Sequence, residues 1–190
     1  MRVTTTTLEL HGAPVEPRPL PDGVRVDRAV DVSPEYARFL YGLVGGPWHW
    51  TDRLGWTRQQ WADELAVPGT EFWILYGKGV PLGYIHLQPQ PTEHGTDVEV
   101  RYFGLVEQAI GRGLGGRLLE HGVAAAWTLA GRAGLAAVAR VWVHTCTLDG
   151  PAALANYRAR GFVVVGTEDA EVDVADQPLG AWASTGGPEG

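Results

Sequence analysis

The sequence predicts an α/β fold of the α+β type, with a central mixed β-sheet of about six to seven strands and helices on both of its faces. Two observations lead to this prediction. Segments with strand periodicity and segments with helical periodicity follow one another along the chain. Between residues 98 and 130, an alternating apolar pattern gives way to a helical one across a glycine-rich turn. The chain has 190 residues, 45% of them hydrophobic, which suits one well-buried domain.

The first part of the chain is expected to hold two strands and two helices. Residues 1–22 should form an N-terminal strand followed by a stiff proline-rich connector, and residues 24–30 a second strand. Ser33 and Pro34 supply an N-cap and a first-turn proline, which predicts that a helix begins here. Thr57 begins a capping-box pattern that opens a second, shorter helix.

The remaining elements are expected in the order strand, strand, strand, helix, strand, helix, strand. Their expected ranges are 71–76, 82–88, 97–105, 114–130, 137–145, 152–160 and 162–167. We therefore expect residues 23–176 to form the functional domain. Residues 177–190 are rich in glycine and proline, which predicts a flexible tail.

A glycine-rich turn opens the long helix expected at residues 114–130. The backbone N–H groups at such a helix start lack intrahelical partners, and the helix dipole adds partial positive charge there. The turn therefore predicts a site for a pyrophosphate. A Walker motif is excluded, because Arg117 and Leu118 stand where that motif needs a lysine followed by serine or threonine.

A dinucleotide-binding pattern is also present in this turn. Gly111, Gly113 and Gly116 have its spacing, but it expects an acidic residue about 20 positions further on to hold the ribose. No acidic residue occurs between Glu120 and Asp149. An NAD-binding oxidoreductase is therefore kept only as a third hypothesis.

Two blocks of the sequence carry a family resemblance. The run Ile110-x-x-Gly113-x-Gly115 resembles the Arg/Gln-x-x-Gly-x-Gly/Ala loop of the GCN5-related N-acetyltransferase (GNAT) superfamily. The block from Asp149 to Phe162 resembles the family's Asn-x-x-Ala-x-x-x-Tyr-x-x-x-Gly-Phe segment. Its matching positions are Ala153, Tyr157, Gly161 and Phe162. The two blocks stand in the family's order and separation.

Two positions depart from the family pattern. Ile110 stands at the usual Arg/Gln position, although Arg112 and Arg117 lie close by in the sequence. Gly150 stands at the usual Asn position, so an amide expected to reach the pantetheine arm is missing. Asp149 could substitute for it.

The resemblance implies an acyltransferase that uses acetyl-CoA as cosubstrate and no metal. It implies transfer of the acetyl group to a primary amine, of a small molecule rather than a protein, by direct attack in a ternary complex. The implied cofactor-binding residues are Leu105, Val106, Gly111, Arg112, Gly113, Leu114, Gly115 and Gly116. The runner-up hypothesis is a regulatory domain that binds acyl-CoA without turnover.

Two residues are expected to be catalytic. Glu99 lies in a Glu-Val-Arg-Tyr run that resembles the strand carrying the general base in the histone-modifying branch of the superfamily. Tyr157 matches the family's general acid, which protonates the departing thiolate. A bulge in the strand is expected to aim the backbone N–H of Leu105 at the acetyl carbonyl. The alternatives are a salt-bridged strand glutamate and a packing tyrosine.

The acceptor is expected to bind at the connection between the first two helices. Trp48, Trp50 and Asp52 would suit an amine there through cation–π attraction and charge. Trp61 and Trp73 are interpreted as core residues instead.

His144 and Cys146 share a strand face, which raises the hypothesis of a cysteine acyl-enzyme. No third orienting group is apparent, so we favour a structural thiol beside a satisfied histidine.

Charge and composition limit the partners. A formal net charge of −7 argues against nucleic acid and suits a cationic substrate. The N-terminal segment lacks an apolar signal core, and no apolar run approaches a membrane span, so a cytoplasmic enzyme without a membrane partner is expected. The single cysteine excludes an internal disulfide and a cysteine-rich metal site. The sequence is compatible with a homodimer.

Overall fold

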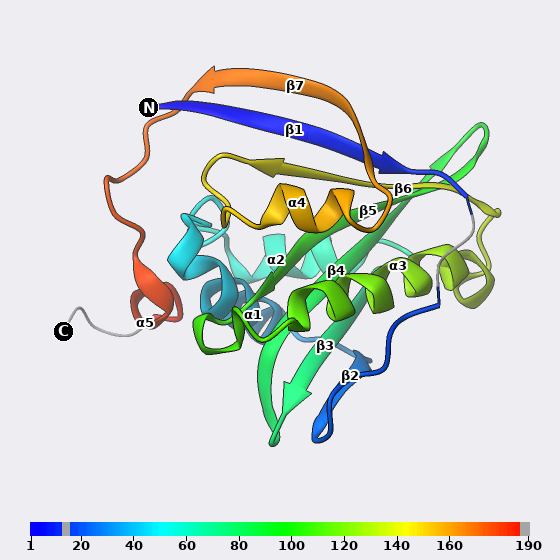
Figure 1. The fold of residues 1–190 in the computed structure, drawn as a ribbon, viewed down its shortest axis with the longest axis horizontal. Coiled ribbons are helices and arrows are strands. Elements are labelled where there is room, and N and C mark those ends of the chain that lie inside the picture. The colour runs from blue at the N-terminus through cyan, green and yellow to red at the C-terminus, as the bar shows by residue number, and fades with distance from the viewer. Residues whose placement is uncertain (13–15, 187–190) are drawn as a thin grey trace.

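The protein is built on one seven-stranded β-sheet flanked by helices (Figure 1). A computed structural model describes residues 1–12 and 16–186. The strands are β1 Arg2–Leu10, β2 Val24–Ala29, β3 Glu71–Gly77, β4 Val80–Thr92, β5 Gly95–Leu105, β6 Val138–Cys146 and β7 Val163–Glu171. The α-helices are α1 Pro34–Gly45, α2 Arg58–Leu65, α3 Leu114–Ala133, α4 Ala153–Arg158 and α5 Gly180–Ser184, and two 3₁₀ turns are η1 Gly46–Trp48 and η2 Glu107–Ala109. The predicted fold class is confirmed.

The N-terminal strand lies inside the sheet, whose strand order is β2-β3-β4-β5-β6-β1-β7. Thr5 of β1 is aligned with Cys146 of β6 on one side and with Glu168 of β7 on the other. These pairings are antiparallel, whereas β5 and β6 are parallel. The strand that we assigned to a segment ahead of the functional domain is thus an interior strand of the same sheet. Residues 13–15 of the expected connector lie outside the described residues.

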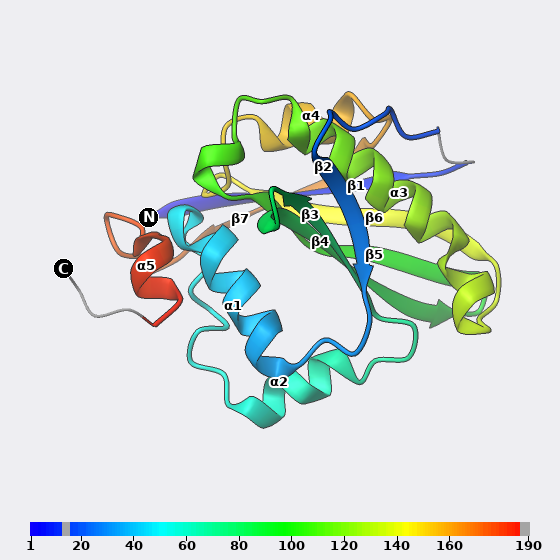
Figure 2. The ribbon, with the colours of Figure 1, turned by 90° about the horizontal axis from the view of Figure 1, so that it is seen from below.

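Helices cover both faces of the sheet, as predicted. Figures 1 and 2 show α3 and α4 on one face and α1 and α2 on the other. α3 packs on β4, β5 and β6, whereas α1 packs on β4 and β5. Between these layers, Tyr84, Ile85 and Leu87 of β4 are almost completely buried. The central strands β4 and β5 therefore supply the core on which the functional side chains rest.

The signals in the sequence set the helix starts. The Ser33 side chain accepts a hydrogen bond from the N–H of Tyr36 at 3.2 Å, which caps α1. Thr57 and Gln60 form the predicted capping box at α2. Both devices satisfy N–H groups that a helix start leaves unpaired. α3 differs, because its N-cap is Gly113, which has no side chain to offer.

The C-terminal segment contains a short helix where a flexible tail was expected. α5 packs against α1, and Ser184 within α5 is 1% exposed. Gly42 of α1 permits this approach, because a side chain there would collide with the backbone of Ser184. Residues 187–190 of the expected tail lie outside the described residues.

β5 changes its neighbours part-way along its length. Its pairing with β6 ends where Glu99 is aligned with Trp142. Its register against β4 shifts between His86 and Leu87, which leaves Arg101 as an extra residue in β5. Such a β-bulge bends a strand and increases its twist. Beyond Glu99 the two strands are no longer paired, and the candidate site opens there.

Candidate active site

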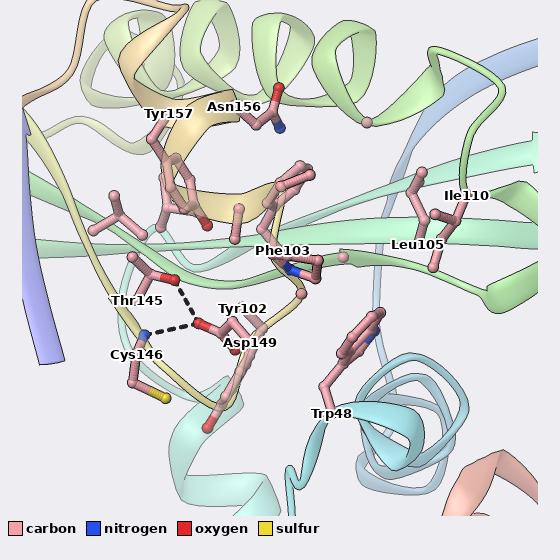
Figure 3. A pocket seen from close by; sticks show the side chains of 18 of the residues that line it. Trp48, Tyr102, Phe103, Leu105, Ile110, Thr145, Cys146, Asp149, Asn156 and Tyr157 are labelled. Atoms are coloured by element: carbon pink, nitrogen blue, oxygen red, sulfur yellow. Dashed lines mark hydrogen bonds between the residues drawn. The ribbon is translucent and has the colours of Figure 1, made fainter. Parts of the chain in front are cut away.

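A cavity of about 840 Å³ lies where β5 and β6 separate (Figure 3). Its walls come from these two strands, the loop after α1, the start of α3, and α4 with the turn that precedes it. This volume falls in the range of pockets that hold small molecules and cofactors. The cavity joins the glycine-rich turn and the tryptophan-containing loop in one continuous space.

The glycine-rich turn forms one end of the cavity. Gly111 and Gly113 have φ values of 78° and 69°, in the left-handed region that favours glycine. Because Gly113 contributes no capping side chain, the N–H groups of the first turn of α3 stay available to an anion. The predicted cofactor residues that line the cavity are Leu105, Gly111, Gly113, Leu114, Gly115 and Gly116.

Two predicted cofactor residues are not among those that line the cavity. Val106 is 2% exposed, and its N–H donates to the carbonyl oxygen of Leu82 at 3.0 Å. Arg112 is exposed and is not one of the residues that line the cavity. The side chain of Ile110, at the usual Arg/Gln position, lines the cavity instead and is 47% exposed.

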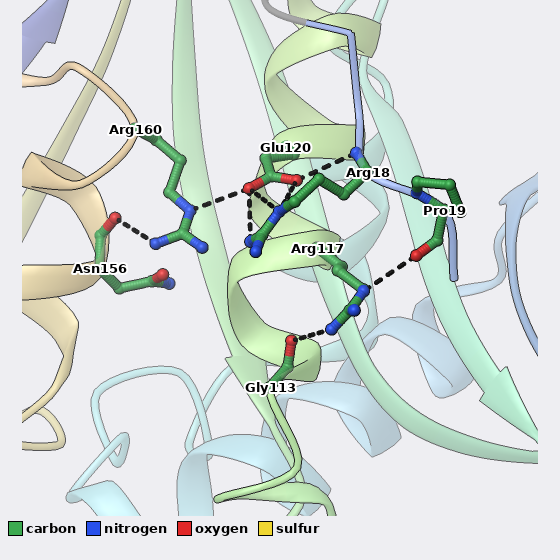
Figure 4. A network of polar contacts seen from close by, with 7 residues as sticks. All are labelled: Arg18, Pro19, Gly113, Arg117, Glu120, Asn156 and Arg160. Atoms are coloured by element: carbon green, nitrogen blue, oxygen red, sulfur yellow. Dashed lines mark hydrogen bonds and ion pairs between the residues drawn. The ribbon is translucent and has the colours of Figure 1, made fainter. Parts of the chain in front are cut away.

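Arginine side chains from three parts of the chain gather along the first turns of α3 (Figure 4). Arg18 of the connector donates to Glu120, with Nη2 2.7 Å from Oε1. Arg117 donates through Nε to the carbonyl oxygen of Pro19 at 2.9 Å. Arg160, which follows α4, brings its Nε to 3.3 Å from Glu120 Oε1 and also lines the cavity. The connector is thus fastened to the helix that carries the turn, with positive charge beside that turn.

The predicted general acid lies deep in the cavity wall. Tyr157 of α4 is 5% exposed and packs edge-on against Phe103 and Phe162. Burial raises the pKa of Tyr157 far above its usual value of 10, and the nearby charge of Asp149 raises it further. The phenol therefore keeps its proton at neutral pH, which is the state a general acid needs.

The predicted general base is buried behind the cavity wall. Glu99 is 1% exposed and is absent from the described residues that line the cavity. Its Oε2 accepts a hydrogen bond from Gln90 Nε2 at 3.3 Å, and Arg101 Nη1 lies 3.4 Å from both of its oxygens. Its Oε1 lies 3.6 Å from Nδ1 of His144, which does line the cavity. The carboxylate therefore does not border the cavity itself, and His144 is the cavity-lining residue beside it.

The tryptophan-containing loop forms the other end of the cavity. Trp48, Trp50 and Asp52 all line it, and they lie beside the turn that follows β6. Trp48 packs on Gly150, where an added Cβ would stand 3.2 Å from the indole ring. Trp50 Nε1 donates to Asp149 Oδ1 at 3.4 Å. The loop after α1 and the turn after β6 thus contact each other at this end of the cavity.

Asp52 carries the most exposed charge of this loop. Its side chain is 66% exposed, accepts a hydrogen bond from the Tyr41 hydroxyl and lies 3.0 Å from Nη1 of Arg53. Burial and the contact with Asp52 raise the pKa of Tyr41 well above its usual value, so that the phenol stays a donor. Trp61 is buried at 2% exposure and Trp73 packs against the core, as interpreted from the sequence.

The amide beside the glycine-rich turn comes from α4 and not from the position of Asp149. Asp149 Oδ2 is occupied by the hydroxyl of Thr145 at 2.5 Å and the N–H of Cys146 at 3.0 Å. Asn156 Nδ2 stands 3.9 Å from the place where a Cβ of Gly115 would be. Asn156 thus brings an amide to the cavity that was not predicted from the sequence, and the role suggested for Asp149 stays a prediction (Figure 3).

Among the cavity-lining residues that the sequence did not point to are Tyr102, Phe103, Asn156 and Arg160. Helical spacing could have indicated two of them, because Asn156 precedes Tyr157 and Arg160 lies four residues after Asn156. The bulge at Arg101 re-aims the residues after it, which strand alternation alone does not reveal.

The remaining candidate groups do not form a second centre. Burial raises the pKa of the Cys146 thiol, which disfavours the thiolate that a cysteine acyl-enzyme needs. Among the described residues, no three or more His, Cys, Asp or Glu side chains are grouped to hold a metal ion. No helix in the same residues is long and apolar enough to cross a membrane.

The model of the acetyltransferase (GNAT) family matches residues 33–162, more than half of the chain. The match includes the glycine-rich turn and the block that ends at Phe162. The chain belongs to the GNAT family of acetyltransferases. Members of this family use acetyl-CoA as cosubstrate.

Solved structures with the same fold differ widely from this GNAT chain in sequence. A GCN5-related N-acetyltransferase from Sphaerobacter thermophilus gives a TM-score of 0.56 at 18% identity, over 87% of this chain and 49% of its own. One from Kribbella flavida gives a TM-score of 0.58 at 18% identity, over 86% of this chain and 55% of its own. A third structure is an aminoglycoside acetyltransferase from an uncultured soil metagenomic sample, in complex with sisomicin. It gives a TM-score of 0.55 at 10% identity, over 73% of this chain and 86% of its own. At these identities the likeness shows the shared fold alone.

The GNAT chain spans about half the length of the first two of these structures. No curated protein sequence matches it significantly.

Proposed function

We propose that this GNAT protein transfers the acetyl group of acetyl-CoA to a primary amine of a small molecule, by direct attack in a ternary complex. The observation that carries the proposal is the continuity of the cavity. One space is lined at one end by the turn before α3 and at the other by Trp48, Trp50 and Asp52. A donor at the turn and an acceptor at the loop would meet beside Tyr157.

The donor end has the groups that a CoA thioester requires. The first turn of α3 offers N–H groups and a positive dipole to the pyrophosphate, and Arg160 adds a guanidinium beside them. Beyond Glu99, the β5 backbone has no β6 partner, so the gap between the strands can take the pantetheine arm. In this arrangement the backbone N–H of Leu105 would meet the acetyl oxygen as charge develops on it.

The acceptor end has the character of an amine site. Asp52 contributes an exposed carboxylate, and Trp48 and Trp50 contribute ring faces that attract cations. The net charge of −7 would draw a cationic substrate towards the protein. The same fold accommodates an amine-bearing small molecule in the structural neighbour that holds sisomicin.

A panel of amines tests the proposal against the alternative of a domain that binds acyl-CoA without turnover. Polyamines, amino acids, aminoglycosides and peptides are each incubated with acetyl-CoA, and free thiol is measured. Release of CoA that depends on one amine class supports the proposal and identifies the acceptor. Tight acetyl-CoA binding with no thiol release from any amine would favour the regulatory domain.

The Tyr157→Phe variant tests the chemistry of the thiolate. No hydrogen bond to the Tyr157 hydroxyl is present among the described residues, so loss of this oxygen should change the free energy of unfolding little. If the phenol protonates the leaving thiolate, kcat should fall by about 10² or more with an unchanged affinity for acetyl-CoA. An acyl donor with a better leaving thiol should recover much of this loss. Equal loss with both donors would assign Tyr157 to cofactor positioning.

A further inference from the structure

A buried carboxylate stands directly behind a cavity-lining imidazole at the point where β5 and β6 separate. Glu99 is aligned with Trp142 in the last pair between these strands, and His144 follows two residues later on the same face of β6. His144 Nδ1 lies 3.6 Å from Glu99 Oε1. The His144 side chain is 48% exposed, whereas that of Glu99 is 1% exposed. The imidazole can reach a bound molecule, and the carboxylate cannot.

Two other residues hold the Glu99 carboxylate in place. Gln90 donates to Oε2, and Arg101 lies against both oxygens. Arg101 is itself held by Glu64 of α2, with Nε 2.8 Å from Oε1. These donors orient the carboxylate, whose Oε1 also faces Nδ1 of His144 and can accept from it when that nitrogen carries the proton.

We propose that Nε2 of His144 takes the proton of the attacking amine and that Glu99 is a positioning residue that acts through His144. This inference rests on the proposed acetyl transfer. A carboxylate at Nδ1 selects the tautomer whose Nε2 carries a free lone pair, and it stabilises the imidazolium that forms. The partial exposure of His144 then lets the imidazolium return its proton to water.

The step balances with groups already in the cavity. The neutral amine attacks the thioester carbonyl carbon, a C–N bond forms, and the amine proton moves to His144 Nε2. The C–S bond then breaks, and the thiolate takes the proton of Tyr157. The proton released by His144 to water restores the Tyr157 phenol through solvent. The products are the acetylated amine and CoA.

The other groups around the cavity are less suited to this role. His49 also lines it, but no carboxylate partner to its ring is found among the described residues. Asp52 is committed to Tyr41 and Arg53. The remaining titratable or charged groups that face the cavity near His144 are Arg101 and Tyr102 of β5, Cys146 of β6, Asp149 of the following turn, and Tyr157 and Arg160 of the α4 segment.

Kinetic variants separate this assignment from a glutamate that acts directly. His144→Gln should lower kcat by about 10² to 10⁴ at neutral pH, leave the KM for acetyl-CoA nearly unchanged and remove the acidic limb of the kcat/KM profile. Glu99→Gln should cost less, and the double variant should lose no more than His144→Gln alone. His94→Gln, whose side chain is 82% exposed on a hairpin, is the matched control and should behave as the wild type.

Two kinetic outcomes would overturn the proposal. One is a His144→Gln enzyme whose pH profile overlays that of the wild type. The other is a larger loss of kcat for Glu99→Gln than for His144→Gln, which would identify Glu99 as the group that accepts the amine proton.

A spectroscopic measurement tests the pair without any acceptor amine. The nitrogen chemical shifts of the neutral His144 ring, assigned by their loss in His144→Gln, should show the proton on Nδ1. A proton on Nε2 in the wild-type protein would overturn the proposal. If no amine releases CoA, the proposed function fails, and the tautomer still decides whether Glu99 orients His144.

Discussion

Acidification should destabilise this protein through one histidine, His86 of β4. His86 is fully buried and stacks on Phe72 with ring centroids 4.2 Å apart. Neither of its ring nitrogens has a hydrogen-bond partner among the described residues. Burial, helped by the charge of Arg101, lowers the pKa of His86 from 6.5 to about 3.

The size of the effect follows from proton linkage. Between pH 6.5 and about pH 3, the histidine is protonated in the unfolded chain and neutral in the folded one. The unfolded state therefore binds more protons, and the free energy of unfolding falls as the pH falls. Each pH unit in that window costs about 1.4 kcal/mol. Acidification from about pH 6.5 to about pH 4.5 should thus remove about 2.7 kcal/mol, a large share of a typical stability of about 5–15 kcal/mol.

His86→Phe is the variant that isolates this term. It keeps a planar ring against Phe72 and removes the titrating nitrogens. Urea unfolding at about pH 7 and about pH 4.5 measures the free energy of unfolding of both proteins, and the carboxylates that they share cancel in the comparison. The variant should lose about 2.7 kcal/mol less than the wild type on acidification. His94→Gln, an exposed control, should lose as much as the wild type.

Equal losses of stability by the wild type and His86→Phe on acidification would contradict this prediction. That result would mean that His86 finds a proton acceptor or solvent in the folded state.

Two further predictions concern the ends of the cavity. Gly113→Glu should strongly weaken acetyl-CoA binding in a calorimetric titration, because a carboxylate would stand where the pyrophosphate is expected. Gly79→Glu, at a hairpin glycine whose φ of 86° imposes similar backbone strain, is its control and should bind normally. Asp52→Asn should raise the acceptor KM several-fold and leave the acetyl-CoA KM unchanged, since Asn can still accept from Tyr41. Equal change in both constants would assign Asp52 to folding.

Local sequence signals predicted most elements of this fold, because caps, turns and periodicity act over a few residues. Ser33 and Thr57 begin helices as predicted. Gly111 and Gly113 adopt the left-handed conformations that such a turn demands. The glycine-rich turn before α3 was predictable for the same reason.

Contacts between distant segments were not predictable in this way. The alignment of Glu99 with Trp142, and hence the approach of Glu99 to His144, depends on the register of two parallel strands that are joined through α3. A shift of one residue would turn these side chains to opposite faces, and no local pattern fixes that register. The position of Arg18 beside Glu120 likewise depends on the path of the connector across α3.

The place of β1 in the sheet has a consequence for how the chain folds during synthesis. β1 emerges from the ribosome before its partners β6 and β7, which follow it only after β2 to β5 and α3 have been made. Pairings between segments so far apart in sequence are slow to form, and until then β1 is an unpaired strand. The same geometry leaves β6 and β7 each with an open edge if β1 is deleted, and open edges recruit strands from other chains. By pairing with β6, β1 therefore covers a strand edge that its deletion would open to other chains.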